Sequence, residues 1–473
     1  MTDVDVLVLG SGAAGLAAAL SAREAGATRV LISEASAEVG GSSRLSGGIV
    51  MGAGSALQRA AGIEDSGADM FAEYMQLQRW DVPAGPVHRF AERSGATIDW
   101  LAGHGVPFFG RLIFGGDERK PRSHCVDGGG QALVDALRRA CDAAGVDVAV
   151  GRRVDRLMTR QNGDSVAVIG AAVAGDELTA GAVVVATGGF GASRTLLEQF
   201  FPSAWDPERT WYIGHDGALG DGFALGAQVG AQLAGLDRGL RTLGPGRTFI
   251  NEAFLPGWTV LLDGTGRRFA DETAPYGILD GLVRTRGNLA IVLLDEACLH
   301  PPAELTARYT ECYKQVWPNH PPFRPRHYRA DIMETLLADG RAHAADDPAK
   351  LAEALGVDAG VLTGEIERYN AHADAGHDAD FGKKAQFLLP LRSAPLYAVP
   401  VRPVTVNVTG AGLRVDDRAR VLGVDGRPVD GLYAAGECVG GLLGPVYMGS
   451  GNSLGLAVGM GRIAGEEAAR DGR

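Results

Sequence analysis

Three glycines and a glutamate near the N-terminus have types and a spacing suited to holding a phosphate-rich ligand. Gly10, Gly12 and Gly15 follow a strand-like apolar run and precede a helix-like run. In that order they allow a tight turn, close approach of a pyrophosphate to the backbone, and close packing of helix on strand. Glu34 ends the next apolar run, nineteen residues after Gly15. A carboxylate there can accept hydrogen bonds from a ribose.

These residues need a βαβ unit to position them. The pattern predicts a strand over 4–9, a helix over 16–26 and a second strand over 29–33. The N-terminus of such a helix presents free N–H groups to phosphate charge. The sequence therefore predicts dinucleotide binding. A purely structural βαβ unit is the alternative, since glycines also mark ordinary turns.

Composition limits the remaining possibilities. A chain of 473 residues is expected to form two or three domains. Its net charge of −12 disfavours nucleic acid and anionic membrane surfaces as partners. Five scattered cysteines without CxxC spacing suggest no metal site, iron–sulfur cluster or disulfide framework. No run of eighteen apolar residues occurs, so we expect no transmembrane segment and a cytoplasmic location.

Further strand and turn patterns divide the chain into three parts. Residues 1–210 and 392–473 contain apolar strands that end in glycine turns, whereas residues 211–391 mix short strands with polar helices. We therefore expect an α/β fold in which one discontinuous Rossmann-like domain is interrupted by an inserted α+β capping domain. A loop of small polar residues, 39–48, could wrap a flat polar ligand, and a proline-rich patch covers 318–325.

Seven short motifs occur in a specific order along nearly the whole chain. They are GSGAAG at 10–15, GGSS at 40–43, ATGGF at 186–190, GDG at 220–222, GTGRRF at 264–269, GLYAAGE at 431–437 and GRIAG at 461–465. Together they resemble the flavoprotein family of soluble fumarate reductases, succinate dehydrogenase flavoprotein subunits and 3-ketosteroid dehydrogenases. The resemblance implies FAD as cofactor, with the capping domain closing substrate against the flavin.

The same resemblance, together with the glycine turns, gives the expected cofactor-binding residues. They are Gly10, Gly12, Ala13, Ala14, Gly15, Glu34, Ala35, Gly41, Ser42, Ser43, Ser46, Gly47, Gly48, Ala186, Thr187, Gly188, Asp221, Gly436, Glu437, Gly451, Ser453 and Leu454. Covalent members attach flavin through a histidine near the second glycine loop. This loop has no histidine, which predicts noncovalent FAD.

Two tyrosines stand where the resemblance places arginines in fumarate-type members. Tyr276 follows the GTGRRF segment at the position of the proton-donating arginine, and Tyr447 replaces the arginine that clamps a carboxylate. Val408 replaces a histidine, and only His215 keeps a fumarate-like identity. Phenols supply no positive charge for a dianion, so dicarboxylate chemistry is disfavoured.

The tyrosines instead resemble the ketosteroid dehydrogenase arrangement. There, one tyrosine removes an α-proton, while a second tyrosine and a glycine amide four residues later bind the ketone oxygen. Tyr276 matches the first, and Tyr447 with Gly451 matches the pair. A phenol O–H and a backbone N–H stabilise enolate charge without adding a formal charge. The alternative interpretation is that either tyrosine is a half-buried packing residue and that His215 is structural.

The resemblance leaves several alternatives open. The substrate is expected to be a small-molecule ketone or enone, either a steroid or a smaller cyclic compound. The direction of the reaction and the electron acceptor or donor cannot be inferred. Reduction of an unsaturated carboxylate is the second possibility; it needs another arginine, with Arg284 and Arg402 as candidates. A flavin-binding protein without catalysis is the third.

Overall fold

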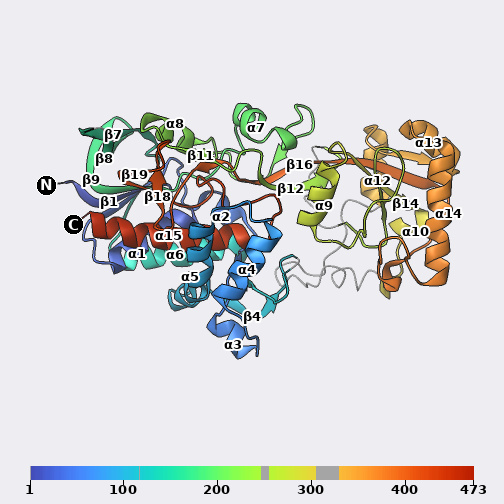
Figure 1. Ribbon diagram of the computed structural model, residues 1–473, viewed down its shortest axis with the longest axis horizontal. Helices are drawn as coiled ribbons and strands as arrows, with labels where there is room; N and C mark the ends of the chain where they lie inside the picture. Colours follow the sequence, from blue (N-terminus) through green and yellow to red (C-terminus); the bar gives the residue numbers. More distant parts are fainter. Residues whose placement is uncertain (1, 117, 164, 247–254, 305–329, 473) are drawn as a thin grey trace. The chain divides into compact units, whose positions relative to one another are not determined.

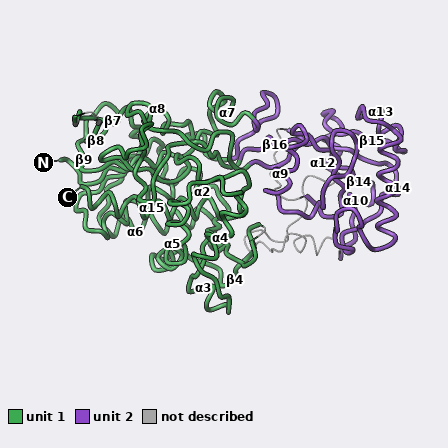
Figure 2. The backbone as a smooth tube through the Cα atoms, viewed as in Figure 1, with its two compact units in different colours: residues 1–202, 214–240, 407–473 green, residues 203–213, 241–406 purple. Residues whose placement is uncertain are grey.

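Two units can be distinguished by their internal contacts in the computed structural model, which describes residues 2–116, 118–163, 165–246, 255–304 and 330–472. Unit 1 comprises residues 1–202, 214–240 and 407–473, and unit 2 comprises 203–213 and 241–406 (Figure 2). The boundaries expected from the sequence, 210/211 and 391/392, differ from this division. The segment with His215 and Asp221 consequently belongs to unit 1. The proline-rich patch at 318–325 lies outside the described residues.

Unit 1 is built on an eight-stranded sheet with the strand order β18-β19-β8-β9-β1-β2-β6, in which β7 also pairs with β8 (Figure 1). The strands are β1 (Val4–Leu9), β2 (Val30–Ser33), β6 (Asp147–Ala149), β7 (Val154–Asn162), β8 (Ser165–Val173), β9 (Asp176–Val185), β18 (Arg420–Leu422) and β19 (Pro428–Ala434). The predicted Rossmann-like α/β fold is confirmed by this topology and by the family match reported below.

Four parallel strands end side by side. Leu9 of β1 is in register with Ser33 of β2 and Val185 of β9, and Val185 is in register with Ala434 of β19. The strands are apolar runs because helices cover the sheet, and all four residues are buried. The segments that follow them therefore begin at one edge, where ligands bind in open α/β sheets.

Two helices, α1 (Ala13–Glu24) and α15 (Asn452–Asp471), pack closely in unit 1 (Figure 1). A Cβ on Gly461 would lie 2.4 Å from the Ala14 carbonyl oxygen, and one on Gly465 only 2.0 Å from that of Ala18. Glycine is needed at both positions because the helix backbones approach one another so closely. This contact fixes the start of α15 beside the turn that follows β1.

The remaining elements of unit 1 surround this core. They are α2 (Gly41–Leu45), β3 (Ile49–Met51), α3 (Ala56–Ala60), α4 (Gly67–Leu77), α5 (Ala84–Gly103), β4 (Phe108–Ile113), β5 (Ser123–Val126), α6 (Gly129–Ala143), α7 (Arg194–Phe200), α8 (Asp221–Gln228), β11 (Leu233–Ala234) and β17 (Gly412–Leu413). Strands β3, β5 and β4 form a separate antiparallel sheet. The predicted loop at 39–48 is partly wrong, because Gly41–Leu45 form the short helix α2.

Unit 2 contains a second sheet, with helices and turns around it. Its strands include β10 (Trp211–Tyr212), β13 (Val260–Leu262), β14 (Ala290–Asp295), β15 (His343–Ala345) and most of β16 (Leu396–Thr409), and its helices include α9 (Tyr276–Arg284), α10 (Glu296–Leu299), α12 (Ala330–Ala338), α13 (Pro348–Leu355) and α14 (Ala359–Ala375). Strand β12 (Gly239–Gly244) continues across the unit boundary and pairs with β16.

Strand β16 is continuous over Leu396–Thr409, where the apolar runs at 396–401 and 404–408 predict two separate strands. Its pairing with β14 ends at Val401, and its pairing with β10 begins at Thr405. The missing N–H of Pro403 therefore falls between these two pairings, where a strand tolerates proline. Among the residues that the structure describes, no helix is long and apolar enough to span a membrane.

Candidate active site

A cleft lies over the carboxyl ends of β1, β2, β9 and β19, and all the residues that line it belong to unit 1. It encloses about 1450 Å³, open solvent included. Nineteen predicted site residues line it: Gly10, Gly12, Ala13, Ala14, Glu34, Ala35, Gly41, Ser42, Ser43, Ser46, Ala186, Thr187, Gly188, His215, Asp221, Gly436, Glu437, Ser453 and Leu454.

Four other predicted glycines and Tyr447 do not line the cleft. A Cβ on Gly15 would lie 1.9 Å from the Gly10 carbonyl oxygen, and one on Gly48 would lie 2.3 Å from the backbone of Gly129. These two glycines therefore allow close packing beside the cleft, as does Gly451, which precedes α15 with φ +97°. Gly47 directly precedes Gly48 in the same loop.

The turn after β1 is suited to a phosphate group. Gly10 has φ +105°, and a Cβ on it would lie 2.3 Å from the Ala186 carbonyl oxygen. Gly12 differs, because a Cβ there would meet nothing closer than the Ser43 hydroxyl at 3.6 Å. The Ala13 N–H at the start of α1 donates to that Ser43 hydroxyl over 3.0 Å. The bare backbone at Gly12 and the helix N-terminus together leave room for a bound anion.

Glu34 ties the ends of β1 and β2 together. One carboxylate oxygen accepts hydrogen bonds from the Ser11 N–H (2.8 Å) and the Ser11 hydroxyl (2.5 Å), and the other accepts one from the Ser36 N–H (2.7 Å). Ser11 in turn accepts a hydrogen bond from the Gly40 N–H. Because each carboxylate oxygen can accept more than one hydrogen bond, Glu34 retains capacity for a ribose hydroxyl.

Two further polar side chains face the cleft from the other strands. The Thr187 hydroxyl is buried and has no hydrogen-bond partner among the described residues, which leaves it available to a ligand. One Glu437 oxygen accepts hydrogen bonds from the Thr409 N–H and hydroxyl, each 2.7 Å long. Burial raises the pKa of the Glu437 carboxyl, and the two bonds from Thr409 partly offset that rise.

Tyr447 places its hydroxyl at the N-terminus of α15. This hydroxyl shares a hydrogen bond of 2.8 Å with the Ser453 hydroxyl and accepts one of 3.1 Å from the Ser453 N–H. Burial raises the pKa of Tyr447, while the bonds with Ser453 lower it. No acceptor for the Gly451 N–H occurs among the described residues. The phenol and this amide therefore lie at one helix start, next to the cleft residues Ser453 and Leu454.

His215 has local partners within unit 1. Its backbone N–H donates to the Ser42 hydroxyl over 3.0 Å, and its ring Nδ1 accepts a hydrogen bond from the Gly217 N–H over 2.9 Å. The neutral ring consequently carries its proton on Nε2. His215 lines the same cleft as the glycine turn after β1.

Tyr276 belongs to unit 2, whereas Tyr447 and Gly451 belong to unit 1. It is the first residue of α9, directly follows Pro275, and is buried. That Tyr276, Tyr447 and Gly451 act together as a catalytic set stays a prediction.

A buried ion-pair network anchors the segment that leads to Tyr276. Arg268 donates to both oxygens of Glu272 and to both of Asp378, at 2.8–2.9 Å. The Lys383 ammonium lies 3.1 Å from Glu272 and is fully buried. His372 and Asp380 lie close enough to Asp378 to suggest a cation site, but Arg268 already occupies both Asp378 oxygens.

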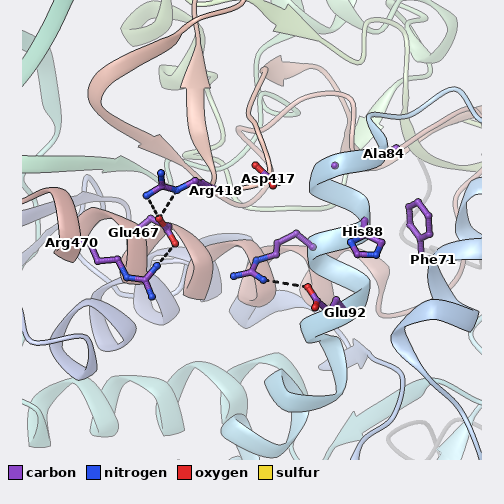
Figure 3. Close-up of a pocket in the computed structure, with 10 residues that line it drawn as sticks. Phe71, Ala84, His88, Glu92, Asp417, Arg418, Glu467 and Arg470 are labelled. Carbon is purple, nitrogen blue, oxygen red and sulfur yellow. Dashed lines mark hydrogen bonds and ion pairs between the residues drawn. The ribbon is translucent and has the colours of Figure 1, made fainter.

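A second groove of unit 1 contains none of the predicted site residues (Figure 3). It is lined by residues of α4, α5 and α15 and by Asp417 and Arg418. Glu467 pairs with both Arg418 and Arg470, and Arg89 pairs with Glu92. Most of the charged groups in this groove are therefore paired with one another.

The comparisons with known proteins agree with this cleft. The family model described as FAD binding domain matches residues 5–454. The chain belongs to this family. FAD is accordingly its cofactor, and the chain is an FAD-dependent oxidoreductase, which confirms both expectations. The bare Gly12 backbone, the unpaired Thr187 hydroxyl and the Glu34 carboxylate fit this cofactor.

Individual relatives in the family differ in their substrates. The probable fumarate reductase Ifc3 of Shewanella frigidimarina is 30% identical over 98% of this chain and 74% of its own length. The vinyl phenol reductase of Lactiplantibacillus plantarum is 28% identical, covering 98% of this chain and 96% of the relative. The structure of 3-ketosteroid-Δ4-(5α)-dehydrogenase from Rhodococcus jostii, in complex with 4-androstene-3,17-dione, is 27% identical with a TM-score of 0.79 over 99% of this chain and 98% of that one.

Several residues that line the cleft of this flavoprotein were not among those predicted. Thr409 holds Glu437, and Ser11 and Ser36 hold Glu34. Ser11 lies within the GSGAAG motif, and Ser36 follows Glu34 by two residues, so their proximity to the site could have been inferred from the sequence. Thr409 lies 28 residues from Glu437, and only the three-dimensional fold brings it there.

Proposed function

We propose that this flavoprotein introduces or removes a carbon–carbon double bond next to a ketone. The observation that carries the proposal is that the Tyr447 phenol and the Gly451 N–H lie at the same helix start, that of α15. FAD, when bound, supplies hydride transfer. The chain's own residues then have to bind the carbonyl oxygen and move a proton at the α-carbon.

Tyr447 and Gly451 are assigned to the carbonyl oxygen. Two neutral donors aimed at that oxygen stabilise the negative charge that develops on it during reaction. Tyr276 is assigned to the proton at the α-carbon. A ketone suits this pair because neither group carries the formal charge that a carboxylate substrate requires.

The relatives support the reaction class in different ways. The Rhodococcus jostii structure holds a ketosteroid, which supports a ketone as substrate. The names of Ifc3 and the vinyl phenol reductase support reduction as the direction. We therefore propose enone reduction first and ketone dehydrogenation second, with an electron donor or acceptor of unspecified class.

An unsaturated carboxylate is the second candidate substrate, because Ifc3 is a probable fumarate reductase. His215 in the cleft would favour it. The two candidates for the further arginine that it would need have other partners, since Arg284 lies 3.5 Å from Asp280 and Arg402 donates to the Asn288 carbonyl. These partners make the carboxylate the weaker proposal.

Anaerobic flavin spectroscopy tests the proposal. The chemically reduced protein should be reoxidised by small cyclic enones and not by fumarate. Replacing Tyr447 or Tyr276 with Phe should lower kcat/KM for the best enone by about 10²-fold or more, the loss typical of a positioned acid or oxyanion donor. Reoxidation by fumarate alone, or unchanged enone turnover in both variants, would refute it.

A further inference from the structure

The segment that carries Tyr447 has no regular secondary structure of its own. Residues 442–448 are neither helix nor strand, although they connect the turn after β19 to α15. A backbone without helix or strand hydrogen bonds is held in one shape only by its neighbours. The groups that fix this segment therefore decide where the Tyr447 hydroxyl lies.

Helix α4 supplies one of those groups, Tyr74, and the residue that caps its C-terminus, Gln78, supplies the other. Tyr74 and Gln78 are four residues apart, so they point to the same side of the helix, and both are fully buried. The Tyr74 hydroxyl donates to the Leu442 carbonyl over 2.7 Å and accepts a hydrogen bond of 3.2 Å from the Asn452 amide. Tyr74 thus joins the start of the Tyr447 segment to the first residue of α15.

Gln78 holds the middle of the segment. Its Nε2 donates to the Val446 carbonyl over 2.6 Å, and its Oε1 accepts a hydrogen bond of 3.3 Å from the Val446 N–H. The side-chain amide pairs with Val446 as a neighbouring strand would, at the residue directly before Tyr447. A Cβ on Gly444 would lie 2.2 Å from Gln78 Oε1, so glycine there is what allows the amide this close.

We infer that Gln78 is a positioning residue, whose amide fixes the backbone at Val446 and so holds the Tyr447 hydroxyl at the start of α15. The expected effect on turnover rests on the proposed function. The effect of Gln78 on the position of Tyr447 does not. Gln78 does not line the cleft, so we expect it to affect turnover only through Tyr447. Its removal should therefore displace the phenol while leaving the FAD cleft intact.

The first test observes Tyr447 directly. The chain has ten tyrosines, and labelling them with 3-fluorotyrosine gives fluorine NMR signals from which the Tyr447→Phe variant identifies that of Tyr447. Gln78→Met keeps most of the side-chain volume and loses both hydrogen bonds. We expect it to shift or broaden the Tyr447 signal in the FAD-loaded protein. Gln76→Met, at an exposed position of α4, is the matched control and should not.

A second test uses the chemistry of a carboxyl group at the same place. Gln78→Glu can accept from the Val446 N–H, but it can donate to the Val446 carbonyl only when protonated. Its enone kcat/KM should therefore fall about 10- to 100-fold at high pH and recover at low pH, relative to the wild type at each pH. Gln78→Met should stay impaired at every pH.

The outcomes separate the two proposals. An unmoved Tyr447 signal in Gln78→Met, in a variant with full FAD content, overturns the positioning role. A shifted signal with unchanged turnover in both Gln78→Met and Tyr447→Phe supports the positioning role and refutes the proposed function. If Gln78→Met fails to bind FAD, the pH-dependent recovery of Gln78→Glu decides, and its absence overturns the inference.

Discussion

Glu118 gives a prediction whose size can be worked out from the structure. Its buried carboxyl accepts hydrogen bonds from the backbone N–H groups of Gly115 and Gly116, and these glycines lie against Gly449 and Ser450. Burial raises the pKa of Glu118 from 4.5 to about 7, despite those bonds and the nearby Arg122. We expect its ionisation to weaken the folded state.

The sign follows from proton binding. Between pH 4.5 and pH 7 the folded protein keeps a proton at Glu118 that the unfolded chain has released. The associated stability is fully present below pH 4.5 and is lost as the pH rises through 7. With about 1.4 kcal/mol for each pH unit, the contribution of Glu118 to the free energy of unfolding should fall by roughly 2 to 3 kcal/mol between pH 5 and pH 8.

Glu118→Gln removes this dependence, because an amide does not titrate. Urea-induced release of FAD, followed by flavin fluorescence at constant excess FAD, reports the unfolding of unit 1 at each pH. The stability of the variant relative to wild type should rise by roughly 2 to 3 kcal/mol from pH 5 to pH 8. Taking this difference cancels the opposing contribution of His124, whose pKa burial lowers to about 4.

Glu198→Gln, at an exposed position of α7, is the control and should follow the wild type at every pH. Two stability curves for wild type and Glu118→Gln that stay parallel from pH 5 to pH 8 would refute the reasoning.

Three further predictions concern packing, charge and the cofactor. Gly465→Ala should destabilise unit 1 by about 1–3 kcal/mol through overpacking, which lowers the urea midpoint for FAD release. Gly103→Ala is the control and should leave the midpoint unchanged, because a Cβ there meets nothing within 4 Å. Lys383→Met should destabilise unit 2 by about 3–5 kcal/mol, seen as faster limited proteolysis, because Glu272 is left buried with less compensation; unchanged proteolysis would contradict this. Acid precipitation should release all FAD into the supernatant, and a yellow pellet would show covalent attachment.

Local sequence patterns predicted the strands and the turns of the cleft, because each depends on neighbouring residues. The run at 4–9 and the glycines after it require no distant information. Strand β16 was divided in the prediction into 396–401 and 404–408, because its change of partner from β14 to β10 between these runs is not visible in the sequence. Gln78 was missed because its partner Val446 lies 368 residues away. The pairing of Tyr276 with Tyr447 stays a prediction.

The interrupted path of the chain through unit 1 has a consequence for its synthesis. Strand β19 pairs with β9, and α15 packs on α1, yet both are translated more than 240 residues after β9 and α1. Until then the end of β9 is an unpaired sheet edge and the alanine face of α1 is bare, the kind of surface that promotes aggregation. A nascent or truncated chain that stops before residue 428 cannot close either one, so completion of the FAD cleft must follow translation of β19 and α15.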